Sequence, residues 1–128
     1  MDKYSDLIKR LEGGEGADRE LDIAIAAATS QYWTEGFRRF LAVFPGRSLI
    51  DYLHHHGGVL PYTTSLDACL ALQEAVLPDW YRSRTNQTPE ASHYLMSNNK
   101  SENYQEVKAV HKSECRAWLI AILKALQP

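Results

Sequence analysis

The sequence predicts an α+β fold, in which N-terminal helices and a C-terminal helix accompany a small antiparallel sheet of about three strands. Apolar residues recur at helical spacing within residues 3–28, 64–77 and 113–126. Residues 80–110 instead form short, partly alternating runs rich in aromatic and β-branched residues, separated by turn compositions. With 128 residues, the chain is long enough for one domain with its own core, which we assign to residues 1–128.

Two short helices are expected at the N-terminus, joined by a glycine-rich link. Residues 3–12 carry an apolar stripe, after which Gly13-Gly14 is expected to end the helix in a left-handed conformation. The second helix is expected to begin at Asp18, whose carboxylate can cap the first turn. The apolar positions of the two helices are Tyr4, Leu7, Ile8 and Leu11, and then Leu21, Ala24, Ile25 and Ala28.

The clearest helix signal lies between Pro61 and Trp80. Thr64 is the expected N-cap, and Asp67 takes the reciprocal position of a capping box, near the positive end of the helix dipole. Pro78 is expected to stop the helix near Leu77. The expected apolar face consists of Leu66, Cys69, Leu70 and Val76.

The strands are expected at residues 80–84, 91–96 and 104–110. Residues 85–89 and 97–101 have turn compositions and are expected to connect them. A final helix begins near Ser113 and is apolar on more than one side, which predicts that it is buried. Its apolar residues include Cys115, Trp118, Leu119, Ile122 and Leu126.

Residues 30–60 are the least regular part of the chain. Helical spacing within 37–44 and again within 48–53 predicts two short helices, and a high aromatic content predicts that the segment packs on the core. The two cysteines fall on predicted apolar stripes and are interpreted as buried free thiols. A disulfide between them is the alternative, and it would need an oxidising compartment.

Composition excludes few partners. A formal net charge of −2 forces neither a broad nucleic-acid footprint nor a polybasic membrane surface, although a local patch is compatible with it. No apolar run approaches membrane-spanning length, and the polar N-terminus predicts no signal peptide. We therefore expect a cytoplasmic protein that does not enter a membrane.

Several short motifs resemble the phage ABA sandwich domain family. They are DLIKRLE at 6–12, RELDIAIA at 19–26, PYTTSLDA at 61–68, a tryptophan at 80 and an Ala/Leu-rich final helix. The resemblance implies an α/β/α sandwich and a phage or prophage origin, hence the cytoplasm of a bacterial host. It implies no activity, cofactor or catalytic residue. Residues 30–60 depart from the family pattern, because they are longer and more aromatic.

A histidine run is the first candidate for chemistry. On a helix, Asp51, His54 and His55 would share a face at a spacing that can hold a transition metal. No Cys lies nearby and no His-Glu-x-x-His pattern follows, so a third dependable ligand is missing. We interpret the run as a solvated helix end before Gly57-Gly58, where histidine favours the negative end of the dipole. No cofactor is predicted.

Arginines interleaved with aromatic residues are the second candidate. A surface carrying Arg38, Arg39, Arg82 and Arg84 could bind single-stranded nucleic acid through phosphate contacts and stacking. The alternative interpretation, which we favour, is that the aromatic residues belong to the core and the arginines flank them.

The sequence therefore favours a small phage accessory protein without enzymatic activity, which binds a protein partner. A nucleic-acid-associated regulator using the arginines, and a metal-dependent enzyme at Asp51, His54 and His55, are the alternatives. The oligomeric state does not follow from the sequence.

Overall fold

A computed structural model describes residues 3–29, 42–43, 45–46, 60–88, 91–98 and 104–127 of the chain. They form, in chain order, α1 (Lys3–Glu12), α2 (Arg19–Ala28), α5 (Leu66–Val76), β1 (Tyr81–Thr88), β2 (Ala91–Ser97), β3 (Glu106–His111) and α6 (Glu114–Leu126). The strands make one antiparallel sheet in the order β1-β2-β3. The predicted α+β class with a small three-stranded sheet is confirmed. The helices expected within 37–44 and 48–53 lie almost entirely outside the described residues.

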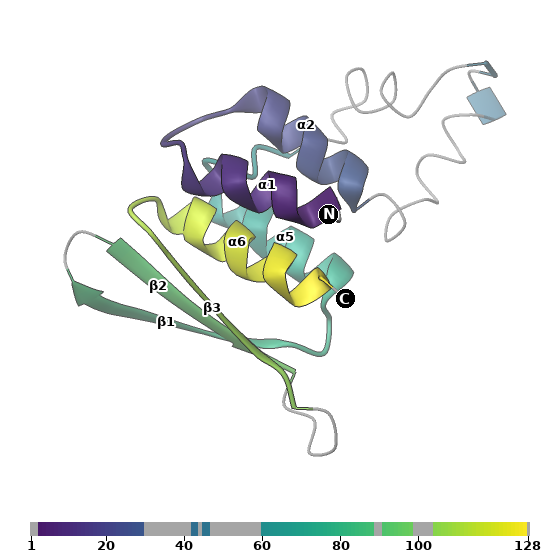
Figure 1. Cartoon of the computed structure of the whole chain (residues 1–128). Helices are drawn as coiled ribbons and strands as arrows, with labels where there is room; N and C mark the ends of the chain where they lie inside the picture. Colours follow the sequence, from purple (N-terminus) through teal and green to yellow (C-terminus); the bar gives the residue numbers. More distant parts are fainter. Residues whose placement is uncertain are drawn as a thin grey trace.

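The C-terminal helix α6 lies at the centre of the described structure. It packs on β2 and β3 with one side and on α1 and α5 with the other, while α2 packs on α1 (Figure 1). Nine residues of α6, from Cys115 to Leu123, are buried, as expected for a helix that is apolar on more than one side. All the helices described lie on the same side of the sheet (Figure 1). A second helical layer, which the α/β/α arrangement requires, is not formed by any described residue.

The sheet has a buried face toward α6 and an opposite face that carries exposed side chains. Tyr94 and Met96 of β2 and Ala109 of β3 point into the core, whereas Tyr81 and Val110 are 63% and 53% exposed. The strands occupy the expected regions, but β1 is longer than predicted because it continues through residues 85–88. Thr85 and Thr88 pair with His93 and Ala91 across a register irregularity, so residues with a turn composition belong to the hairpin ladder.

The α5 helix ends as expected but begins one residue later. Ser65, not Thr64, is the N-cap, and its hydroxyl accepts a hydrogen bond from Ala68 N. Thr64 instead belongs to a turn, because its amide donates to Pro61 O at 3.1 Å. The predicted apolar face was also partly wrong: Leu66 is 41% exposed. The buried positions are Ala68, Cys69, Leu72, Gln73 and Val76.

The N-terminal helices match the sequence pattern closely. All four predicted apolar positions of α1 are buried, and Asp18 caps α2 by accepting a hydrogen bond from Leu21 N at 3.0 Å. The left-handed stop predicted at Gly13-Gly14 is wrong. Gly13 N still donates to Lys9 O in helical fashion, and the positive φ of 71° occurs at Gly16. The buried face of α2 differs from the predicted stripe, since Asp22, Ile23 and Ala26 are buried while Ala24 and Ala28 are half-buried.

Candidate functional site

Strand β1 forms one edge of the sheet that the described residues build. The direction in which the N–H and C=O groups of β1 point can be inferred from the pairing of β2 with the residues just before β3. Asn98 N donates to Gln105 O, so residue 98 and every second residue before it in β2 face β3. The intervening β2 residues face β1, where Leu95 opposes Ser83. The N–H and C=O groups of Arg82 and Arg84 therefore point away from β2, toward an edge with which no other described strand pairs, called the open edge below.

The side chain of Arg82 covers a buried aromatic pair. Its Cζ lies 4.2 Å from the centroid of the Trp118 ring, a cation–π arrangement. Tyr94 stacks on Trp118 with a centroid separation of 5.5 Å and an interplanar angle of 11°. Trp118 is only 3% exposed, whereas Arg82 is exposed. The positive charge of Arg82 is thus fixed at the rim of the core, beside the open edge.

Arg84 belongs to a polar cluster two residues along the same strand. Its Nε lies 2.5 Å from Glu114 Oε1, and the same oxygen accepts a hydrogen bond from the Tyr94 hydroxyl at 2.8 Å. Burial, and then the bond to Glu114, raise the pKa of Tyr94, so the phenol stays protonated and acts as a donor. The Glu114 carboxylate offsets the charge of Arg84, whereas no residue that the structure describes forms an ion pair with Arg82.

Gln73 orients Trp118 through a hydrogen bond with its indole N–H. The Trp118 indole N–H donates to Gln73 Oε1 at 2.7 Å, and Gln73 Nε2 donates to Trp80 O at 3.3 Å. The amide thus connects α6, α5 and the residue that precedes β1. This explains why a polar residue occupies the buried face of α5, since a buried amide is tolerated when its hydrogen bonds are made.

Only part of the predicted arginine–aromatic surface lies within the residues that the structure describes. Arg82 and Arg84 share one face of β1, as their i, i+2 spacing requires. Both side chains contact groups of this chain, one through Trp118 and the other through Glu114. Arg38 and Arg39 lie outside the described residues.

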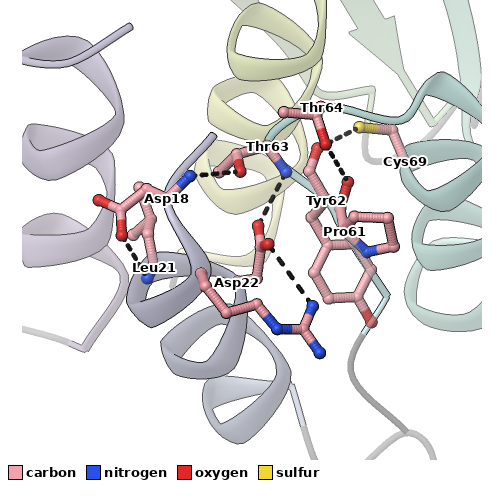
Figure 2. Close-up of polar contacts among 9 residues, drawn as sticks. Asp18, Leu21, Asp22, Pro61, Tyr62, Thr63, Thr64 and Cys69 are labelled. Carbon is pink, nitrogen blue, oxygen red and sulfur yellow. Dashed lines mark hydrogen bonds and ion pairs between the residues drawn. The ribbon is translucent and has the colours of Figure 1, made fainter. Parts of the chain in front are cut away.

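A second polar network joins α2 to the turn before α5, and sequence reasoning missed it. Thr63 N donates to Asp22 Oδ1 at 2.9 Å, while Asp18 N donates to Thr63 Oγ1 at 3.0 Å (Figure 2). Asp22 also lies 3.7 Å from the guanidinium of Arg19. The only local signal was an acidic residue in the first turn of α2, which equally suits the helix dipole. Asp22 and Thr63 are buried and their hydrogen bonds are internal, so we assign the network a structural role.

The two cysteines are free and buried, as the sequence interpretation predicted. Cys69 Sγ donates to Tyr62 O at 3.2 Å and lies 3.8 Å from Cys115 O (Figure 2 shows the first contact). Burial, and then the neighbouring Cys115, raise the pKa of Cys69. A buried thiol held in its protonated form is a poor nucleophile, so this pair is not suited to covalent catalysis.

The candidate metal ligands Asp51, His54 and His55 fall outside the described part of the chain. Within the part that is described, no group of three or more His, Cys, Asp or Glu side chains could hold a metal ion. His111, which is described, accepts a hydrogen bond at Nδ1 from Ser113 N at 2.8 Å and so supports the start of α6. Among the described helices, none is both long and apolar enough to cross a membrane.

Comparison with known proteins adds no relationship to this geometry. No protein-family model, curated protein or solved structure matches the chain.

Proposed function

We propose that this chain is a non-enzymatic binding protein, which recruits an extended segment of a protein partner along the open edge of β1. The observation that carries the proposal is the outward direction of the Arg82 and Arg84 backbone groups. An extended peptide that adds to such an edge gains main-chain hydrogen bonds, while its alternate side chains read the neighbouring surface.

The side chains at this edge suggest what the partner segment carries. Arg82 lies on the face toward α6 and its charge is not offset by Glu114 in the way that the charge of Arg84 is. Tyr81 lies on the opposite face and is 63% exposed. A strand with an acidic residue facing Arg82 and an apolar residue beside Tyr81 complements both faces.

A protein partner is favoured over nucleic acid for two physical reasons. Nucleic acid has no peptide ladder with which to pair the open backbone groups of β1. Phosphate binding along a nucleic-acid backbone also needs several free cations, whereas Arg84 at this edge is already paired with Glu114. Peptide binding at this edge does not depend on the organism that makes the protein. The phage origin implied by the family resemblance therefore stays a prediction, as does the cytoplasmic location.

The test begins with a displayed library of random decapeptides. Enriched peptides should combine β-forming residues with an acidic side chain, and their affinities can be measured by calorimetry. Arg82→Pro removes the outward N–H without touching the ladder to β2, and it also removes the charge. Arg82→Gln removes the charge and the contact with the Trp118 ring but keeps the backbone N–H, so it is the matched control for the backbone contact.

We expect Arg82→Gln to weaken binding roughly 2- to 5-fold, in line with an exposed ion pair. Arg82→Pro should weaken it by roughly a further 3- to 10-fold, because one backbone hydrogen bond is lost. Peptides that bind the Arg82→Gln and Arg82→Pro variants with equal affinity would contradict the proposal. Tight, salt-sensitive binding of single-stranded DNA that is lost when Arg82 and Arg84 are both replaced by Gln would favour the nucleic-acid alternative.

A further inference from the structure

The other edge of the sheet, β3, also has an open side among the described residues. Because Gln105 faces β2, alternation places Val107 and Ala109 toward β2, and Glu106, Lys108 and Val110 away from it. A separate contact agrees with this direction. The ammonium of Lys124 donates to Lys108 O at 3.0 Å, at a position exposed to solvent.

Four side chains line the exposed face of this edge. Ala109 points into the core, so the residues on either side of it point to the opposite face. Tyr104 and Val110 are 57% and 53% exposed, and Glu106 and Lys108 between them are exposed as well. The Tyr104 hydroxyl donates to Glu106 Oε2 at 2.7 Å, which shows that these two side chains share one face. Along the edge the order is apolar, acidic, basic, apolar.

This order is complementary to itself when the strand is reversed. We propose that β3 pairs with β3 of a second copy of this chain, in an antiparallel register with the two-fold axis at Val107. Glu106 then lies opposite Lys108 of the partner subunit, and Tyr104 lies opposite Val110 of the partner subunit. The ion pair and the apolar contact each occur twice, because the interface is isologous.

The backbone fits the same register. Glu106 and Lys108 both direct their N–H and C=O groups outward, so they form a hydrogen-bonded pair across the axis, and Tyr104 and Val110 form the next. The Lys108 carbonyl has two lone pairs and can accept from the partner while Lys124 remains bound. The result is one continuous six-stranded sheet.

Charge selects this register over its neighbours. A shift by two residues in one direction places Lys108 opposite itself, and a shift in the other direction places Glu106 opposite itself. Like charges directly opposite each other are destabilising. At the other edge, registers centred between Arg82 and Arg84 bring arginine opposite arginine, so charge disfavours those registers. The charge pattern of β3 is therefore better suited to a second copy than that of β1.

Charge exchange on the intact chain tests this interface. The mass in solution, measured by light scattering during gel filtration, should be twice the 14.5 kDa of one chain. Glu106→Lys alone and Lys108→Glu alone each turn two attractive pairs into two repulsive ones. Each variant should weaken the dimer roughly 10- to 100-fold. Both side chains are exposed, so circular dichroism should show an unchanged fold.

Two further experiments restore the opposite charges across the interface and so test whether the loss of the dimer is due to charge. The double variant Glu106→Lys/Lys108→Glu exchanges the charges and should recover the dimer. An equimolar mixture of the two single variants should form a heterodimer, because each supplies the charges that the other needs. A wild-type chain that stays monomeric up to millimolar concentration overturns the inference. So does a dimer that ignores the single variants, or a double variant that remains monomeric.

Discussion

Arg116 is a buried arginine, only 2% exposed, and it is held by backbone carbonyls. Its Nη1 donates to Arg10 O and Leu11 O at 3.3 and 3.2 Å, and its Nη2 donates to Gly16 O at 3.0 Å. The first two carbonyls belong to the last turn of α1, which has no intrahelical donor for them. A cation there also favours the negative end of the helix dipole. Arg116 therefore acts as a C-cap supplied from the other end of the chain.

Gly14 leaves the room that this guanidinium occupies. A Cβ built on Gly14 would lie 2.9 Å from Nη1 of Arg116, closer than real Cβ atoms approach, and 3.2 Å from Nη2. The guanidinium cannot retreat without losing its hydrogen bonds. We expect Gly14→Ala to destabilise the fold by about 1–3 kcal/mol, as overpacking does.

Gly13→Ala is the matched control, because a Cβ at that position meets only Lys9 O at 3.4 Å. It should change the free energy of unfolding by less than about 1 kcal/mol, and an alanine that extends a helix can even be favourable. Urea unfolding of both variants measures the difference. Equal stabilities would show that Arg116 relocates easily.

Tyr62 gives the fold a dependence on alkaline pH. Burial, with a smaller effect of the Asp22 carboxylate, raises the pKa of Tyr62 from 10.0 to about 12. As pH rises, the unfolded chain releases the Tyr62 proton first. The stabilising contribution of the protonated phenol to the free energy of unfolding is therefore complete below pH 10 and is lost by about pH 12. The free energy of unfolding should fall across this window, and burial of Tyr94, Cys69 and Cys115 adds to the fall in the same direction.

Tyr62→Phe isolates the contribution of the single phenol. Its unfolding free energy should fall less steeply than that of the wild type between pH 10 and 12, by up to about 1.4 kcal/mol per pH unit. Denaturant melts at intervals of half a pH unit would show this. Parallel curves for the two proteins would mean that Tyr62 is not protected in the folded state.

At the scale of the elements, what could be predicted from sequence was whatever is encoded locally. The buried face of α1 and the Asp18 cap follow from spacing and side-chain chemistry, and both are confirmed. Gln73 could not be assigned to the core, because its burial depends on Trp118, 45 residues away. Gly14 was interpreted through its conformation, whereas its actual constraint is space beside Arg116. Local patterns carry no information about such distant contacts.

The position of α6 makes it indispensable. It separates the sheet from α1 and α5 and buries Trp118, Leu119 and Ile122 almost completely. Each such side chain contributes roughly 1.5–3 kcal/mol on burial, against a total stability of about 5–15 kcal/mol for a domain. A chain that ends at Ser113 should therefore show no cooperative thermal transition by circular dichroism. A chain lacking only residues 127–128 is the control and should still unfold cooperatively.

At the scale of the whole molecule, the candidate site shows where sequence reasoning stopped. The alternation of Arg82 and Arg84 with nearby aromatic residues was visible in the sequence, but the ring that Arg82 contacts, Trp118, lies far along the chain in α6. The direction of the backbone groups at each edge was not visible, because it depends on which residues of β1 and β3 face β2. Both the proposed peptide-binding edge and the proposed dimer interface rest on that direction.

The metal hypothesis can be tested on the intact chain. A native site would bind the folded state selectively, and at a hundred times its dissociation constant the metal would add about 2.7 kcal/mol of stability. We expect zinc and EDTA to give the same melting temperature, and His54→Ala with His55→Ala to change it little. A zinc-dependent rise that disappears in the double variant would restore Asp51, His54 and His55 as a metal site.

The contact between Arg116 and the end of α1 also affects how the chain folds as it is made. The carbonyls of Arg10 and Leu11 are synthesised early, but their donor lies 106 and 105 residues further along. During synthesis, α1 therefore emerges from the ribosome long before Arg116 has been made. The core cannot close until α6 has emerged. Contacts this distant also slow folding, because loop closure precedes the gain from packing. Closure of this core is therefore expected to wait until α6 has been synthesised.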